Sequence, residues 1–193
     1  MNDFMLASGR SITLPMGDLL VEIYQVRMSD FDYFITDALP IKKDLLALES
    51  KDIAEITKTF LSHAAQTVAL LTRFTSLSDA DIEQMASQLE HISQVIYAFY
   101  SLNSAFFDES EPKQTKAKTD TKNTWFDSFQ FLISQGHTHT EIMQYSYGAY
   151  LGYCKAAGRA YKNDLKAQAN MYRTAQHGDK SAMDKFNREL SKD

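Results

Sequence analysis

The chain has 193 residues and a mass of 22.0 kDa, which suits one domain of generous size or two small ones. Its net charge of −5 and pI near 5.5 argue against nucleic acid as the main partner, because phosphate backbones bind basic surfaces. Hydrophobic residues make up 44% of the sequence, which excludes a wholly disordered chain.

Cysteine usage and hydropathy indicate the compartment. Cys154 is the only cysteine, so the fold cannot depend on an internal disulfide or an oxidising environment. The N-terminus carries Asp3 where a secretory signal would carry positive charge, and no stretch reaches the about 18 apolar residues of a membrane-spanning helix. We therefore expect a soluble, cytoplasmic protein with no membrane partner.

The first predicted element is a β-hairpin. Apolar residues alternate with polar ones on both sides of an expected turn at residues 15–18. An isolated hairpin is marginally stable in water, so it must pack on helices or pair with the edge of another copy. The candidate residues for this packing or self-association are Ile12, Leu14, Leu19, Val21 and Ile23.

Helical periodicity begins after Met28, with Ser29 and Asp30 as candidate N-cap residues. Pro40 is expected to end this helix, because proline lacks an N–H group and clashes with the preceding turn. A second segment then runs through Leu45 and Leu48.

Two long amphipathic helices are expected next, joined by a short turn as an antiparallel hairpin. The first runs from Ser50 to Phe74, and the second begins at Ser78, which forms a capping-box pattern with Asp81, and runs to Tyr100. Their apolar stripes are Ile53, Ile56, Phe60, Ala64, Thr67, Leu71 and Phe74, and then Ile82, Met85, Leu89, Ile92, Ile96, Phe99 and Tyr100.

The composition changes at residues 108–124, which contain no aromatic or branched aliphatic residue. Such a segment cannot bury itself and is expected to be a polar, flexible linker. It would separate a domain of β-hairpin and helices, residues 1–107, from a helical C-terminal extension, residues 125–193. The predicted fold class is mainly α, with a small N-terminal β-hairpin followed by an antiparallel helical bundle.

The extension is predicted to hold three helices. A short one begins at Trp125 and ends near Gly136, a long one runs from Thr140 to Gln176, and Gly178 precedes the last. This extension is too thin for an independent core, so it is expected to pack on the first domain, on another copy or on a partner.

Aromatic residues and two glycines make the extension a candidate partner-binding surface. Gly148 and Gly152 form a G-x-x-x-G pattern, which lets another backbone approach a helix closely. Tyrosine is common both in cores and in interfaces, so both interpretations stay open. The candidate residues are Trp125, Phe126, Phe129, Tyr145, Tyr147, Gly148, Tyr150 and Gly152.

Catalytic signals are sparse. His137, His139 and Glu141 are the only histidine–carboxylate cluster and a candidate metal site. Thr138 and Glu141 also form a T-x-x-E capping box, which explains this corner better as the start of a helix. The sequence contains no nucleotide-binding loop, metalloprotease motif or nucleophile elbow, so it predicts neither an enzyme nor a cofactor.

The order of these elements resembles the tail assembly chaperones of long-tailed bacteriophages. The similarity lies in the β region "ITLPMGDLLVEIYQVRMSDF", the helix ending "ALPIKKDLL", the paired helices of residues 52–107, the Lys/Thr-rich linker and the short helical tail. In that family, a chaperone binds the long helical tape measure protein and helps the tail tube polymerise around it, and it is absent from the finished virion. Many members are extended by a translational frameshift.

The resemblance implies a non-enzymatic tail assembly chaperone in the cytoplasm of a bacterial host. Its partners would be the tape measure protein, the tail tube protein and further copies of itself, and residues 125–193 would correspond to the frameshift extension. Three alternatives stay open: a structural tail or baseplate component, a generic bacterial helical adaptor, and a metal-dependent enzyme using His137, His139 and Glu141.

Overall fold

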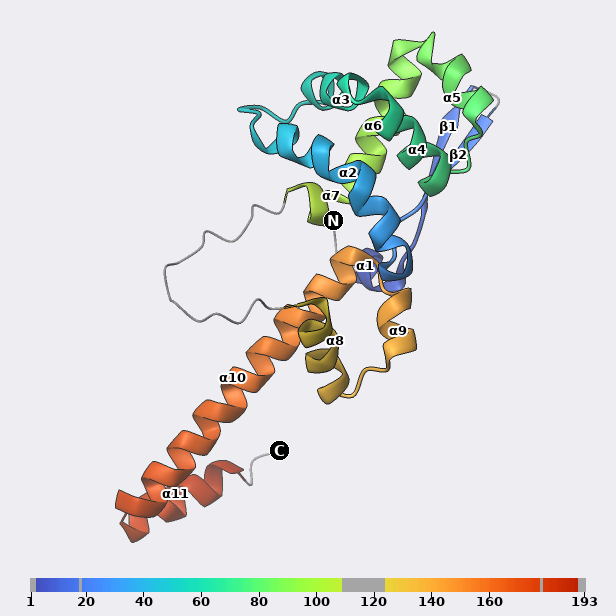
Figure 1. Ribbon diagram of the computed structural model, residues 1–193. Coiled ribbons are helices and arrows are strands. Elements are labelled where there is room, and N and C mark those ends of the chain that lie inside the picture. Colours follow the sequence, from blue (N-terminus) through green and yellow to red (C-terminus); the bar gives the residue numbers. More distant parts are fainter. Residues whose placement is uncertain (1–2, 18, 109–123, 178, 191–193) are drawn as a thin grey trace. The chain divides into compact units, whose positions relative to one another are not determined.

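Figure 1 shows the computed structural model of the chain, which describes residues 3–17, 19–108, 124–177 and 179–190. Helices account for 75% of the residues and a small antiparallel hairpin precedes most of them, so the expected mainly α fold is confirmed. The elements, in chain order, are α1 (Asp3–Ser8), β1 (Ile12–Met16), β2 (Leu19–Ile23), the 3-10 helix η1 (Met28–Asp30), α2 (Phe31–Leu46), α3 (Ile53–Ser62), α4 (Ala64–Phe74), α5 (Asp79–Ala86), α6 (Leu89–Leu102), α7 (Ser104–Phe107), α8 (Trp125–Ser134), α9 (His139–Gln144), α10 (Tyr147–His177) and α11 (Lys180–Leu190).

The chain forms two compact units, residues 1–152 and 153–193. Residues 125–152, which were expected to belong to the C-terminal extension, pack within the first unit. Most of the expected linker, residues 109–123, lies outside the described residues.

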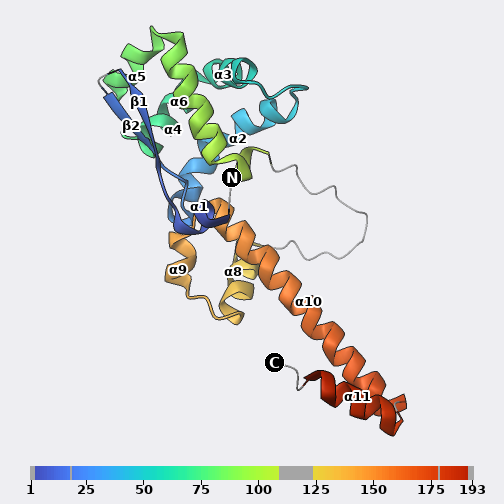
Figure 2. The same ribbon diagram turned by 180° about the vertical axis from the view of Figure 1, so that it is seen from behind.

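The predicted hairpin is confirmed as an antiparallel pair in which Leu14 faces Val21. The turn is tighter than expected: Pro15 lies in β1 opposite Leu20, and Gly17 has a positive φ of 61° that suits glycine. Asp18, the last residue of the expected turn, lies outside the described residues. In Figures 1 and 2 the hairpin lies beside α5, so it packs on helices as its marginal stability requires.

Backbone hydrogen bonds cover one edge of the hairpin. Tyr24 N–H donates to Phe74 O over 2.9 Å, and Ser76 N–H donates to Glu22 O over 2.9 Å, so the residues after α4 extend the sheet beside β2. Because antiparallel hydrogen bonding alternates along a strand, Thr13 and Pro15 turn their backbone groups towards the outer edge of β1. Pro15 has no N–H group to donate, which weakens this edge as a template for another strand.

The prediction that Pro40 ends a helix is wrong, because α2 continues through it to Leu46. Phe34, Ala38, Ile41 and Leu45 recur at helical spacing on both sides of the proline, and all four are fully buried. Burial of this stripe offsets the about 3 kcal/mol that a proline costs inside a helix.

The prediction of two uninterrupted long helices is also wrong. The first divides into α3 and α4 at His63, whose φ of −110° and ψ of 52° are not helical. His63 bonds through its ring to Asp44 over 2.8 Å, and the Thr67 hydroxyl donates to Phe60 O over 2.6 Å across the break. The apolar stripe runs on through this break, so periodicity alone did not reveal it.

The second long helix divides at Ser87 and Gln88 into α5 and α6. Its start is as predicted: Ser78 accepts a hydrogen bond from Asp81 N–H, and the Asp81 carboxylate accepts one from Ser78 N–H, which completes the capping box. With both helices broken, the expected two-helix hairpin becomes a bundle in which α3 packs mainly on α6 and α2 packs on α4.

Phenylalanine rings form the centre of the first unit. Phe34 is fully buried, and its ring centroid lies 4.8 Å from that of Phe106, 5.7 Å from Phe74 and 5.9 Å from Phe107. Most of these pairs are edge-to-face, the geometry that aromatic quadrupoles favour. The core therefore joins residues of α2, α4 and α7 through one aromatic cluster.

Buried polar side chains connect the hairpin to the helices. Asn103 Oδ1 accepts from Val26 N–H over 2.9 Å, while its Nδ2 donates to Phe99 O over 3.1 Å and Tyr24 O over 3.3 Å. Gln25 Nε2 donates to Met5 O and Arg10 O, which holds α1 against the segment after β2. These amides satisfy backbone groups that irregular segments would otherwise bury without a partner.

The short helix α8 is confirmed at both ends. Thr124 and Asp127 form a capping box at its start. At its end, Gly136 N–H donates to Ile133 O and His137 N–H donates to Leu132 O, with a glycine φ of 96°. This is the Schellman arrangement, for which a glycine after the last turn is typical.

The next helix begins as predicted but does not run without a break to Gln176. Thr138 and Glu141 cap α9, which ends at Gln144, and α10 starts only at Tyr147. Between them, Tyr145 O accepts from Met28 N–H and Tyr147 N–H donates to Val26 O, both over 2.9 Å. This strand-like pairing with the segment before α2 interrupts the helix and anchors α9 to the first unit.

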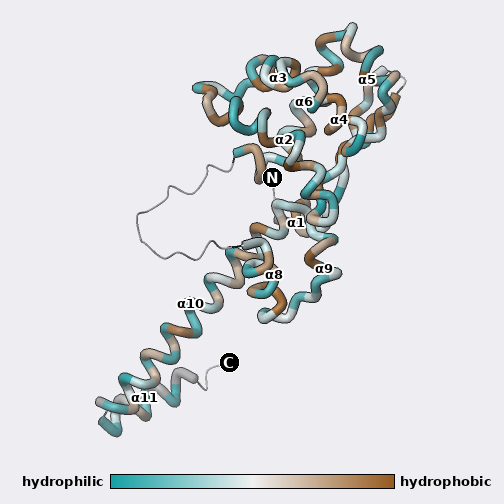
Figure 3. Tube along the Cα trace, viewed as in Figure 1, coloured by the Kyte–Doolittle hydropathy of each residue, from teal (hydrophilic) through white to brown (hydrophobic). Residues whose placement is uncertain are grey.

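The second unit contains the rest of α10 and α11. The last helix is confirmed as Lys180–Leu190, whereas Gly178, the expected break, lies outside the described residues. Figure 3 shows hydrophilic and hydrophobic residues alternating along α10. We refer to residues 153–177 of this helix as distal α10.

Candidate functional site

The most apolar concavity among the described pockets is a groove of about 410 Å³ between α3 and α6, named here the α3–α6 groove. Its lining residues are Ile53, Ala54, Thr57, Lys58, Leu61, Leu89 and Ser93. On α3, three of them follow each other at intervals of four residues, and on α6 the two lining residues have the same interval. Residues at this spacing share one face of a helix, so both helices turn a continuous face towards the groove.

The two faces of α3 explain why this helix creates a groove. Ile56 and Phe60 are fully buried in the aromatic core, while Ile53 and Leu61 on another face are 43% and 39% exposed. A helix that is apolar on two faces has more apolar surface than one core can cover. On α6, Leu89 is 63% exposed and adds to the same surface.

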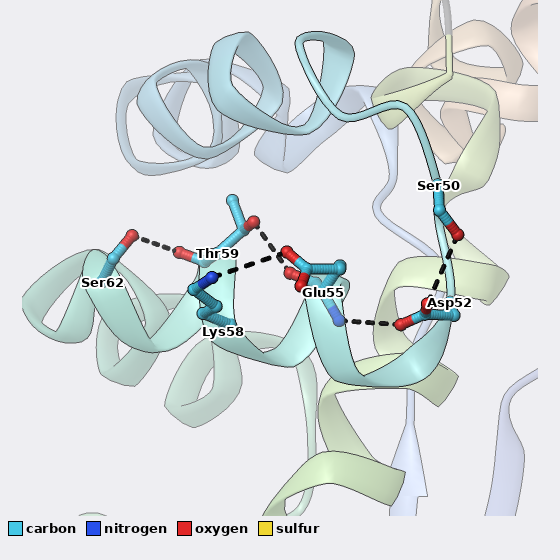
Figure 4. Close-up of polar contacts among 6 residues, drawn as sticks. All are labelled: Ser50, Asp52, Glu55, Lys58, Thr59 and Ser62. Carbon is cyan, nitrogen blue, oxygen red and sulfur yellow. Dashed lines mark hydrogen bonds and ion pairs between the residues drawn. The ribbon is translucent and has the colours of Figure 1, made fainter.

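Local hydrogen bonds fix α3 along the groove (Figure 4). The Asp52 carboxylate accepts from Glu55 N–H over 2.9 Å, and this bond is the main reason why the pKa of Asp52 lies below its usual value. Lys58 forms an ion pair with Glu55 at 3.8 Å, and the Thr59 hydroxyl donates to Glu55 O over 2.8 Å. These contacts hold the helix in place and leave the apolar lining residues uncovered.

One buried hydroxyl belongs to the groove. Thr57 is only 4% exposed, and its Oγ1 has no hydrogen-bond partner in the part of the chain that the structure describes. Leaving a buried polar atom unsatisfied costs about 1–3 kcal/mol. A core position chosen for stability alone would carry valine, which has the same shape and no hydroxyl. The unsatisfied hydroxyl of Thr57 therefore distinguishes the groove lining from ordinary core packing.

Sequence reasoning missed this groove. Ile53 and Leu89 belong to the two predicted apolar stripes, but the structure leaves them 43% and 63% exposed, outside the packed core. The sequence does contain a sign of the groove. Ile53 and Leu61, together with Ile56 and Phe60, give α3 more apolar residues than one helix face holds.

The predicted partner-binding aromatic residues mostly contact one another within the first unit. Tyr147 is 8% and Tyr150 2% exposed, and the Tyr147 ring stacks on Phe31 at 4.5 Å. Trp125 lies 5.2 Å from Phe31 and 5.9 Å from Tyr150, while Phe129 lies 5.9 Å from Tyr150. The core therefore accounts for most of this set.

Two members of that set stay open to solvent. Phe126 is 80% and Trp125 45% exposed, at the start of α8. Neither residue lines one of the described pockets, so this apolar surface has no concave wall beside it there.

The two glycines of the G-x-x-x-G pattern differ in the space beside them. A Cβ atom at Gly148 would lie 2.6 Å from Leu6 Cδ2 and 3.3 Å from Ala105 Cβ, so α10 approaches α1 and α7 closely there. A Cβ atom at Gly152 would meet nothing within 4 Å. The close approach that the motif predicted is thus intramolecular, and it involves the first glycine.

The candidate self-association residues of the hairpin differ in how far they are buried. Val21 and Ile23 are fully buried in their own copy, and Ile12 and Leu14 are half-buried. Leu19 is 39% exposed and lines a second cleft of about 430 Å³ with Met16, Met85 and His91.

The histidine–carboxylate cluster has structural contacts. His137 Nδ1 bonds to the Tyr145 hydroxyl over 2.9 Å, and the Glu141 carboxylate accepts from Thr138 N–H over 2.7 Å. His139 lies against the Phe129 ring. Within the described ranges no group of three or more His, Cys, Asp and Glu side chains is placed to hold a metal ion.

Comparisons with protein-family models, with curated proteins and with solved structures give no match to this chain. In the part of the chain that the structure covers, no helix combines the length and apolar character needed to cross a lipid bilayer.

Proposed function

We propose that the protein is a non-enzymatic tail assembly chaperone of a phage or prophage, and that its α3–α6 groove binds an apolar helical segment of the tape measure protein. The observation that carries this proposal is the groove itself, with Ile53, Leu61 and Leu89 exposed along two adjacent helices. The order of elements along the chain, which resembles that of tail assembly chaperones, supplies the identity of the client.

The lining of the groove suits a helix that must be held and later released. An amphipathic helix binds such a groove through apolar residues at positions i, i+4 and i+7, without any reactive group on the chaperone. Ser93 at its border offers a polar contact that orients the client helix. A chaperone also needs a groove that is partly hydrated when empty, and half-exposed leucine and isoleucine side chains provide it.

The first test is whether a long helical protein is encoded next to this gene, and the second is co-purification with segments of that protein. Leu61→Asp and Leu89→Asp are each expected to weaken binding at least about tenfold, because an aspartate in an apolar contact loses a central part of the binding energy. Leu20→Asp is the matched control: Leu20 is 66% exposed on the hairpin, so the same change there should leave affinity within about twofold.

Two outcomes would overturn the proposal. One is unchanged binding by both groove variants, and the other is stoichiometric presence of the protein in purified virions. The latter result would favour a structural tail or baseplate component instead.

A further inference from the structure

Distal α10 exposes a row of large apolar side chains. Tyr161, Leu165 and Tyr172 are 51%, 46% and 63% exposed, and their spacing of four and seven residues places them on one side of the helix. Leu165 and Tyr172 alone give this side two large side chains one heptad apart. This single interval equals the heptad spacing at which helices present apolar side chains to another helical surface.

A basic row follows the apolar row along the same helix. Its members are Lys155, Arg159, Lys162, Lys166 and Arg173, all exposed. They recur at intervals of four, three, four and seven residues, so they also share one side of the helix, next to the apolar row. Distal α10 is therefore amphipathic in a particular way, apolar on one side and cationic beside it.

Charge divides the chain at the boundary between the two units. Residues 153–193 contain nine Lys or Arg against five Asp or Glu, out of 20 and 25 in the whole sequence. The remaining 152 residues therefore carry 11 basic and 20 acidic side chains. The second unit is cationic and the first strongly anionic, so the first unit of one copy attracts the second unit of another.

The α3–α6 groove carries part of this negative charge. Asp52 and Glu90 adjoin its lining residues along the chain, Glu49 lies four residues before Ile53, and all three carboxylates are exposed. The two lysines nearby are already engaged, Lys51 with Asp108 and Lys58 with Glu55. An apolar groove with unneutralised carboxylates beside it matches an apolar row with cations beside it.

We propose that distal α10 of one copy binds the α3–α6 groove of a second copy, with Leu165 and Tyr172 against Leu61 and Leu89 and the basic row next to Glu49, Asp52 and Glu90. The carboxylates beside the groove favour a cationic helix as the occupant, and the chain carries such a helix in its own second unit. The proposed client helix would compete with distal α10 for this groove. The self-association is nevertheless a property of the purified protein alone and does not depend on the client. This surface is separate from the hairpin residues predicted above for self-association.

Sedimentation velocity over a range of protein concentrations tests the proposal. The full-length chain is expected to self-associate, and raising the salt concentration from about 0.05 M to about 0.5 M should weaken the association at least about fivefold, because salt screens exposed charges. Leu165→Asp and Leu89→Asp should each weaken it at least about tenfold.

Each variant has a matched control that adds the same charge on another side of the same helix. Asn163→Asp on α10 and Gln94→Glu on α6 change exposed residues away from the two docking faces and should leave association within about twofold. Leu89 is the first residue of α6, where an aspartate stabilises the helix. Weaker association of Leu89→Asp therefore cannot be explained by loss of folding. A chain that stays monomeric at about 0.1 mM, or variants that associate as the natural chain does, would overturn the proposal.

Disulfide trapping tests which surfaces meet. In a Cys154→Ala background, Leu89→Cys and Leu165→Cys are made in separate chains and mixed under mild oxidation. A dimer that forms much faster in the mixture than in either sample alone is expected, with Asn163→Cys in place of Leu165→Cys as the control that does not form it. Equal rates in the mixture and in the separate samples would overturn the assigned contact.

Discussion

The two units of this protein bury their aromatic residues to very different extents. In the first unit, Phe34, Phe60, Phe99 and Phe107 are fully buried and contact one another. In the second, Tyr161 and Tyr172 are more than half exposed. The first unit therefore holds its helices by packing, while distal α10 has six alanines and several lysines that favour a helix without a core. The first unit is therefore a packed core, whereas the helix of the second unit leaves large apolar side chains exposed.

The largest expected effect comes from the centre of the aromatic core. Phe34→Ala should lower the free energy of unfolding by about 3–5 kcal/mol, because it removes a fully buried ring and leaves a cavity. Tyr172→Ala in distal α10 should change it by less than about 0.5 kcal/mol. Chemical denaturation at a concentration where the chain is monomeric measures both, and equal losses would erase the difference between the units.

Asn103 provides the second contrast. Asn103→Leu removes the acceptor of Val26 N–H and the donor to Tyr24 O, so the free energy of unfolding should fall by about 2 kcal/mol. Asn170→Leu on exposed distal α10 should change it by less than about 0.5 kcal/mol. The same denaturation experiment measures both changes. An Asn103→Leu variant with an unchanged free energy of unfolding would show that the hairpin does not need these hydrogen bonds.

The two glycines of α10 test where close packing ends along the helix. Gly152→Ala should stabilise the protein by about 0.5–1 kcal/mol, because alanine favours a helix and meets nothing there. Gly148→Ala should be less stable than Gly152→Ala by about 1 kcal/mol, since Leu6 and Ala105 must shift. Thermal melts of the two variants in parallel provide the comparison, and equal melting temperatures would contradict the contact with α1.

The smallest effect concerns pH and the helix caps of the first unit. Hydrogen bonds from Ser78 to Asp81 and from Thr138 to Glu141 hold the pKa of each carboxyl below its usual value, and a bond from Thr124 does the same for Asp127. A lowered folded-state pKa adds stability above the unfolded-state value of about 4, and this stability is lost as the pH falls through the folded-state value.

Stability measured at intervals from about pH 6 to pH 3 should therefore decline below about pH 4. The helical signal of α8 and α9 is expected to fall with it, while distal α10 has no such carboxylate cap among its described residues. Combined Ser78→Ala and Thr138→Ala should flatten this part of the profile, and an unchanged slope would contradict the role assigned to the caps.

The sequence allowed the helix starts to be predicted better than the helix breaks. The capping boxes at Ser78 and Thr138 are local patterns, in which a side chain bonds to a backbone group three residues away, so a short stretch contains the whole signal. The breaks at His63 and at Tyr145 depend on Asp44 and on residues 26–28, which are distant along the chain. No local pattern contains those partners.

The same distinction applies to the candidate sites. Trp125, Tyr147 and Tyr150 were predicted as partner-binding residues from composition, but composition does not tell that Phe31 of α2 packs against two of them. The α3–α6 groove arises from the pairing of two helices separated by α4 and α5, and only two of its apolar residues, Ile53 and Leu89, belong to the predicted apolar stripes. Pro40 shows the reverse case, in which tertiary burial of a stripe outweighs a strong local signal.

The most direct test of the account is amide hydrogen exchange of the full-length chain at several protein concentrations. Exchange in distal α10, α3 and the start of α6 is predicted to slow together as the concentration rises, while the amides around Phe34 stay slow throughout. Leu165→Asp should abolish the dependence on concentration in all three segments, and Asn163→Asp should preserve it. Exchange in distal α10 that is equally fast at every concentration would contradict the claim that this helix binds the α3–α6 groove of a second copy.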